Sequence, residues 1–296
     1  MLNIPAFYTS ALYFVLTAVL LSACSSSGPA MRDTDDTAGE FSLLNKNGDP
    51  ASYTQLLEAA AAHDIVLFGE LHGNATAHRL QHKLSADLDE KLREQNVQLF
   101  LAMEMFEADQ QSLMDGFISG RLTEAEFEDH ARLWQNYESD YKPLIEFAST
   151  EGLPVIASNI PRPFASQVHH EGLESLDALG ETAQNYMAPL PIEVDLELPG
   201  YAAMLEMGGH GGGEPENLAR AQAVKDATMA HFMLTHLNAD ENRRIMHFNG
   251  RYHSDNYEGI YWYLRHYGFE GDILTISTLM EGEAVEERAD FILMTE

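Results

Sequence analysis

The chain has 296 residues, which is enough for one large domain or two small ones. With 45% hydrophobic residues it can bury a sizeable core. Its 47 Asp and Glu residues stand against 17 Lys and Arg residues, which gives a formal net charge of −30. A surface of that sign repels phosphate groups and argues against nucleic acid as a partner, although acidity on this scale also serves solubility alone.

The N-terminus has the features of a targeting segment. Residues 11–21, ALYFVLTAVLL, have the length of a signal-peptide hydrophobic region, although no Lys or Arg precedes them. The stretch Leu21-Ser22-Ala23-Cys24 resembles the lipobox of bacterial lipoproteins, and Cys24 is the only cysteine. We expect residues 1–23 to be a lipoprotein signal peptide and Cys24 to carry acyl chains such as palmitate, which would anchor the protein to a lipid bilayer. Ser25, where inner-membrane lipoproteins carry aspartate, favours the outer membrane and its periplasmic side.

The rest of the chain predicts a polar tether over residues 24–40 and one folded domain over residues 41–296. Short apolar runs in this domain are typical of strands buried on both faces of a parallel sheet. They lie at 64–69, 98–103, 153–157, 245–249, 272–276 and 290–294. Helical stretches alternate with them, at 54–62, 75–94, 108–119, 123–133, 140–150, 217–237 and 257–267. The alternation predicts an α/β fold, a mostly parallel sheet flanked by helices, with an inserted helical cap subdomain from insertions at about 106–135 and 163–240.

Polar residues follow several of these predicted strands. Glu70 and His72 come after the first apolar run, Glu104 after the second and His253 after the fourth. Both histidines belong to a Gly-x-x-His pattern, in which the glycine would let the backbone turn at the strand end. Ligands of open α/β sheets bind at the carboxyl ends of strands, so these side chains are expected to converge. Such a set can hold a divalent transition metal or activate water, unless the histidines only satisfy backbone groups.

Several motifs in their order resemble one known family. They are GELHGNATAHRLQHKL (69–84), LAMEMFEADQQ (101–111), WQNYESDYKPLIEFA (134–148), PVIASNIPR (154–162) and NGRYHSDNYEGI (249–260). Over roughly residues 50–280 the chain is similar to the ChaN family of haem-binding lipoproteins, from a superfamily that includes Tiki metalloproteases, TraB-like proteins and erythromycin esterases. The resemblance implies an α/β core with a helical subdomain and haem uptake beside an outer-membrane haem receptor. It also implies a homodimer that stacks two haems, each iron taking a tyrosine from one subunit and a histidine from the other.

Candidate haem ligands in this chain are Tyr137, Tyr141 and His210. The two tyrosines are four residues apart and would share one face of a helix, where they could equally be packing aromatics. His210 lies in MGGHGGG, a loop that could carry an imidazole to a second subunit or remain an exposed loop tip. Our hypothesis pairs Tyr141 with His210 of the partner subunit. The i, i+4 pair His78 and His82 has a geometry that can bind metal, but we expect it on a solvated helix face, with the alternative that His78 faces the cleft.

Two functions are compatible with these features. The favoured one is a lipid-anchored haem-binding protein that takes part in haem and iron uptake at the outer membrane. The alternative is a metal-dependent or His/Glu-activated hydrolase of the Tiki or erythromycin-esterase type, using Glu70, His72, Glu104 and His253. Neither a Gly-x-Ser-x-Gly elbow nor a His-Glu-x-x-His motif occurs, so an enzyme is the less favoured of the two.

Overall fold

The computed structural model describes residues 42–206 and 214–296, all within the compact unit Thr37–Glu296. The predicted signal peptide and tether, Cys24 and His210 lie outside the described residues. Within the described residues, no helix combines the length and apolarity that crossing a bilayer requires.

The described residues form an eight-stranded sheet in the order β2-β1-β8-β7-β3-β6-β4-β5. Its parallel strands are β3 (Ile65–Glu70), β4 (Gln98–Glu107), β5 (Val155–Asn159), β6 (Arg243–Gly250), β7 (Ile273–Met280) and β8 (Phe291–Thr295). At one edge, β1 (Ser42–Asn45) and β2 (Pro50–Ala51) add an antiparallel hairpin. The mostly parallel α/β sheet expected from the apolar runs is thus confirmed, and the hairpin is the part that those runs did not indicate.

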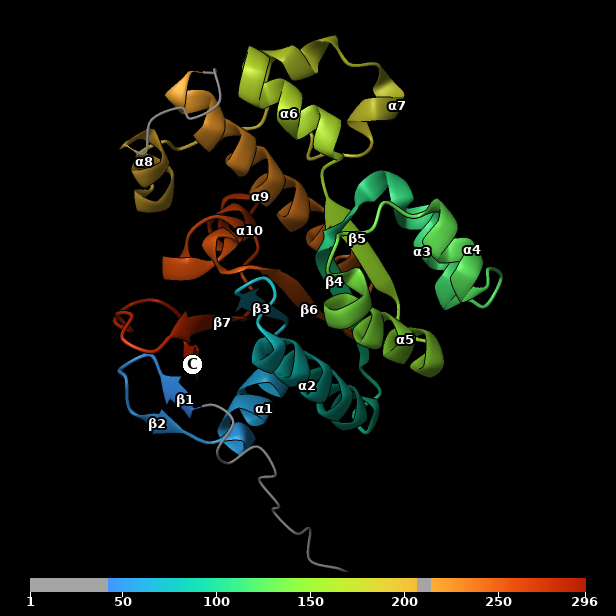
Figure 1. Cartoon of the computed structure of the whole chain (residues 1–296), viewed down its shortest axis with the longest axis vertical. Helices are drawn as coiled ribbons and strands as arrows, with labels where there is room; N and C mark the ends of the chain where they lie inside the picture. The colour runs from blue at the N-terminus through green and yellow to red at the C-terminus, as the bar shows by residue number, and fades with distance from the viewer. Residues whose placement is uncertain (1–41, 207–213) are drawn as a thin grey trace, which may run out of the picture. The chain divides into compact units, whose positions relative to one another are not determined.

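Helices cover both faces of the sheet (Figure 1). One face carries α1 (Tyr53–Ala62), α2 (Ala75–Arg93), α3 (Gln111–Ile118), α4 (Glu124–His130) and α5 (Lys142–Glu151). The other carries α6 (Arg162–Glu171), α8 (Pro199–Glu206), α9 (Pro215–Leu237) and α10 (Ile260–His266), with α7 (Glu181–Gln184) in the connection between α6 and α8. Along β3, Val66 and Phe68 pack into the first core and Ile65 and Leu67 into the second, because successive strand residues face opposite ways.

Two local features of the first face determine where polar groups lie. Strand β4 runs to Glu107, further than the apolar run indicated, and its register with β5 shifts between Met103 and Glu107. Glu104 therefore belongs to the strand, at an irregularity of the kind that re-aims side chains. Before α5, Tyr137–Tyr141 forms a short π-helix, a feature often found at functional sites.

Helix α9 passes through the second core. It packs against β5, α6, α8 and α10, and most of its inward residues are small, among them Ala219, Ala223, Ala227 and Ala230. Small side chains let a helix approach a sheet and other helices closely. This close approach brings polar residues of α9 to the carboxyl ends of the strands.

Gly259, just before α10, allows a test of the close packing between α9, α10 and the His253 backbone. Its φ of 53° and ψ of −118° suit glycine alone, and a Cβ there would overlap the His253 carbonyl. We expect Gly259→Ala to lower the free energy of unfolding by at least about 3 kcal/mol. Gly73→Ala is the matched control, because Gly73 also has a positive φ, 80°, but a Cβ there meets nothing within 4 Å. Its cost should be about 1 kcal/mol. Urea unfolding measures both, and equal losses would contradict the steric argument.

Candidate functional site

Glu70, the last residue of β3, organises a first cluster of polar side chains. It is 1% exposed, and its two oxygens are fully engaged. Oε1 accepts a hydrogen bond from the Tyr141 hydroxyl at 2.7 Å and lies 2.8 Å from His72 Nδ1. Oε2 accepts from Gln81 Nε2 at 2.6 Å and lies 3.5 Å from His78 Nδ1. We call Glu70, His72, His78, Gln81 and Tyr141 the Glu70 cluster.

His72 is the member of the Glu70 cluster that solvent reaches, since 43% of its side chain is exposed. Its ring meets Trp134 edge-on, with centroids 5.1 Å apart. The hydrogen bond to Glu70 raises the pKa of His72, while partial burial opposes the shift. A carboxylate that fixes one ring nitrogen and leaves the other toward a cleft is the usual support for a general base or an iron-binding imidazole.

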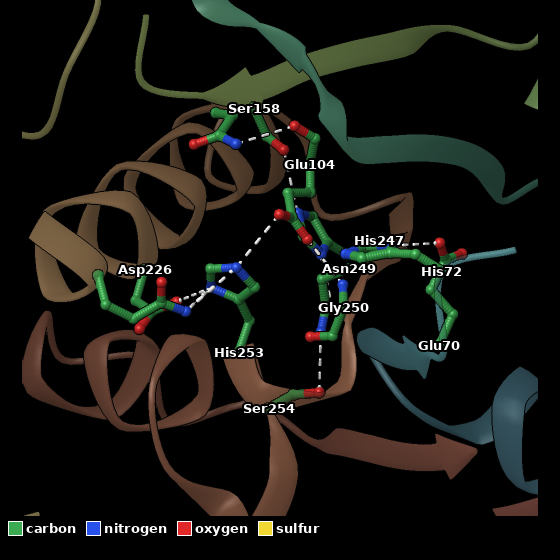
Figure 2. Close-up of polar contacts among 12 residues, drawn as sticks. Glu70, His72, Glu104, Ser158, Asp226, His247, Asn249, Gly250, His253 and Ser254 are labelled. Carbon is green, nitrogen blue, oxygen red and sulfur yellow. Dashed lines mark hydrogen bonds and ion pairs between the residues drawn. The ribbon is translucent and has the colours of Figure 1, made fainter. Parts of the chain in front are cut away.

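His253 anchors a second cluster on the other side of β6. Its Nε2 lies 3.2 Å from Glu104 Oε1, and its Nδ1 contacts Asp226 of α9 (Figure 2). The Tyr201 hydroxyl donates to Asp226 Oδ2 at 2.7 Å, and the Gly250 N–H donates to Glu104 Oε2 at 2.7 Å. We call His253, Glu104, Asp226 and Tyr201 the His253 cluster. Its imidazole is held between two buried carboxylates.

This arrangement fixes the charge of His253. Burial opposes a buried imidazolium, but Glu104 and Asp226 outweigh burial and raise the pKa of His253 to about 10. Burial would raise the pKa of Glu104, yet His253 and the Gly250 N–H lower it to about 2. At neutral pH the pair is therefore an imidazolium beside a carboxylate. A protonated imidazole cannot take a proton from water, so the raised pKa disfavours His253 as a general base.

The two Gly-x-x-His motifs meet where β3 and β6 pair. Glu70 lies opposite Gly250 in that register. A Cβ on Gly250 would come 2.7 Å from His72 Nε2, and a Cβ on Gly69 would come 2.9 Å from the Arg251 Cα. Each glycine thus makes room for the other motif. The expectation that these glycines allow a sharp turn was wrong, because Gly250 has an ordinary φ of −57° and the requirement is close approach.

The structure brings the four predicted residues Glu70, His72, Glu104 and His253 to one end of the sheet. Among the described residues, however, no group of three or more His, Cys, Asp or Glu side chains is arranged to hold a metal ion. The carboxylates bind the histidines instead of leaving their oxygens for a cation. The predicted transition-metal site is therefore not supported.

The predicted haem ligands have different surroundings. Tyr141 is 1% exposed with its hydroxyl bound to Glu70, and Tyr137 is 5% exposed and packs against Phe106. Burial, and next the charge of Glu70, raise the pKa of Tyr141. His210 lies outside the described residues, so the pairing of Tyr141 with His210 stays a prediction.

Several site residues were missed or misplaced from the sequence. His78 was expected on a solvated face but is 8% exposed, 3.5 Å from Glu70 and 3.3 Å from Asp140. Its position about one turn into α2, shortly after His72, is the signal that pointed to the alternative placement facing the cleft. Asp226 was not singled out, because it stands in a run of small residues whose burial the sequence does not reveal.

A pocket of about 440 Å³ opens beside Glu104, between α6 and α9. Trp134 and Gln222 are among its lining residues, and both also touch the clusters. Gln222 Nε2 lies 2.9 Å from His253 Nδ1, and Trp134 contacts His72. Both clusters are therefore next to a cavity that a small ligand can enter.

Comparison with known proteins gives the following matches. A family model described as haem-binding uptake, Tiki superfamily, ChaN matches residues 56–264. A solved structure of ChaN of Campylobacter jejuni with cofacial haem has a TM-score of 0.68 at 15% identity, covering 87% of this chain and 98% of that chain. A mutant erythromycin esterase, EreC, in its open conformation has a TM-score of 0.46 at 13% identity, covering 81% and 78%. No curated protein sequence matches the chain.

The charge of His253 leads to a prediction about stability and pH. A folded-state pKa of about 10 against an ordinary 6.5 gives stability that is fully present below pH 6.5 and is lost as pH rises toward 10. The stability difference between wild type and His253→Gln should therefore fall by roughly 1–3 kcal/mol between pH 6.5 and 9. His247→Gln is the control, because burial lowers the pKa of His247 to about 4 and leaves it neutral throughout this range. Urea unfolding at both pH values decides; a flat difference for His253→Gln would show an uncharged imidazole.

Proposed function

The chain belongs to the haem-binding uptake family of the Tiki superfamily, ChaN, and on this basis we propose that it is a lipid-anchored haem-binding protein that takes part in haem uptake at the outer membrane. The observation that carries the proposal is the family match over residues 56–264. The lipobox-like stretch before Cys24 supports the anchor and the periplasmic location. An outer-membrane haem receptor is the partner that such a location would serve.

Haem binding needs a protein side chain that is exposed enough to reach the iron. The phenol of Tyr141 is buried and its hydrogen bond to Glu70 opposes the phenolate form that ferric iron prefers. Tyr252, the residue before His253, has 72% of its surface exposed beside Arg251, whose guanidinium lies 5.4 Å from its ring. Tyr252 thus fits an iron ligand better than Tyr141 in this conformation. Tyr141 would have to leave Glu70 first.

A homodimer would follow from haem binding through such an exposed residue. One subunit would cover one face of the haem. The other face would stay open to a second haem or a second subunit. The cofacial haem described for ChaN of Campylobacter jejuni supports this arrangement. A histidine of the partner subunit would then complete the iron coordination, as the sequence resemblance implies, and our hypothesis assigns this role to His210.

The Glu70–His72 pair favours a second candidate function. His72 is a partly exposed imidazole oriented by a carboxylate 2.8 Å away, and its ring contacts Trp134, which lines the pocket next to Glu104. This geometry suits a His/Glu-activated hydrolase in which His72, and not the protonated His253, is the base. An esterase and peptidase panel on wild type and His72→Gln tests it; hydrolysis that persists in the variant would exclude His72 as the base.

Haemin titration tests the haem proposal. Wild type should give a saturable Soret shift, and Tyr252→Phe should weaken haemin binding by about tenfold or more, because phenylalanine keeps the ring but removes the iron-binding oxygen. Tyr141→Phe is the matched control, since it removes the other candidate oxygen. His210→Ala tests the ligand from the partner subunit in the same assay.

The outcomes separate the assignments. A loss confined to Tyr141→Phe would restore the sequence-based pairing and show that Tyr141 leaves Glu70 on binding. Haemin binding to wild type no tighter than to a bland control protein would refute the haem function itself. Size-exclusion chromatography with and without haemin measures the proposed dimer.

A further inference from the structure

The pocket beside Glu104 contains cations for which the described part of the chain offers no partner. Among the described Lys and Arg side chains, those that make no hydrogen bond, ion pair or ring contact are Lys46, Arg162 and Lys225. Lys46 lies in the exposed turn between β1 and β2. Arg162 and Lys225 both line the pocket, one from the start of α6 and the other from the middle of α9.

Unpaired cations are unexpected in this chain. Carboxylates outnumber basic groups by 47 to 17, and other pocket carboxylates already have partners. Glu104 faces His253 and the Gly250 N–H, and Glu107 is paired with Arg132 at 2.9 Å. Within residues 42–206 and 214–296, no ion-pair partner therefore neutralises Arg162 or Lys225. A ligand with a negative group can.

Other pocket atoms define the rest of the ligand. Asn159 is 9% exposed, and its Oδ1 is buried without a hydrogen-bond partner, while its Nδ2 donates to the Glu104 carbonyl at 3.0 Å. His169 Nδ1, also on the pocket wall, is buried and unpartnered as well. The rest of the wall includes the apolar Trp134, Ile160 and Leu218, and the polar Ser166 and Gln222. The positive end of α6, which begins at Arg162 without a side-chain cap, adds to the attraction for an anion.

We propose that this pocket binds a carboxylate group carried on an apolar body, with Arg162 and Lys225 as its cationic contacts. Two sources share this chemistry: a propionate of haem, which rests on the proposed function, and a separate small carboxylic acid, which does not. Either source leaves a guanidinium and an ammonium as the determinants of affinity. Charge-assisted hydrogen bonds of this kind are about twice as strong as neutral ones.

The test compares charged probes with neutral analogues of the same shape. Haemin is titrated against haemin dimethyl ester by absorption, and hexanoate against hexanamide by calorimetry, all with the full chain. The pocket variant is Arg162→Gln with Lys225→Gln. The control is Lys46→Gln with Arg121→Gln, which removes the same charge from exposed positions outside the pocket. Circular dichroism checks folding, and Lys225→Gln alone repeats the test should the double variant not fold.

Wild type should bind at least one charged probe about tenfold or more tightly than its neutral analogue, and the pocket variant should lose that preference while the control keeps it. A preference for haemin over its ester identifies the propionate, and a preference confined to hexanoate identifies a free acid. No preference in wild type, or an equal loss in the control, overturns the proposal. Absent haemin binding with an intact hexanoate preference would refute the haem function but leave the carboxylate pocket standing.

Discussion

The site depends on the close approach of the ends of β3 and β6. Neither Gly69 nor Gly250 has room for a side chain, because each lies against the other Gly-x-x-His motif. This contact holds His72 over the backbone of β6, next to the Gly250 N–H that binds Glu104. A single methyl group at either glycine would separate the Glu70 cluster from the His253 cluster, although neither cluster contains the glycines.

The two histidines that this contact brings together have opposite characters. His253 is buried between Glu104 and Asp226 and carries a fixed positive charge, which offsets the cost of burying two carboxylates. His72 is partly exposed and has one buried carboxylate, Glu70, that is also satisfied by Tyr141 and Gln81. The buried His253 and its carboxylates therefore have a structural role, and His72 is the histidine that a ligand can contact. Sequence alone treats the two histidines as equivalent because both follow the same pattern.

The parallel strands were predictable from sequence because each is a continuous apolar run between turn residues. The β1–β2 hairpin was not, since its strands are short and partly exposed. Strand ends correctly indicated Glu70, His72, Glu104 and His253 as neighbours. The sequence could not show that their carboxylates pair with the histidines, nor that α9 brings Asp226 into the site, because both depend on helix packing across the sheet. His78 was misplaced for the same reason: its burial comes from the π-helix that covers it.

The net charge of the whole protein restricts which ligands the pocket can bind. A net charge of −30 repels every approaching anion at long range, which slows association and leaves selectivity to direct contacts. Arg162 and Lys225 carry two positive charges between them and can neutralise one or two carboxylates, but each further charge on a ligand would face a surface dominated by carboxylates. A polyanion such as a nucleotide is therefore disfavoured, whereas one or two carboxylates on an apolar body keep the attraction and avoid most of the repulsion. Arg162 and Lys225 thus determine selectivity as well as affinity. The acidic surroundings repel every ligand that carries more negative charge than these two cations can pair.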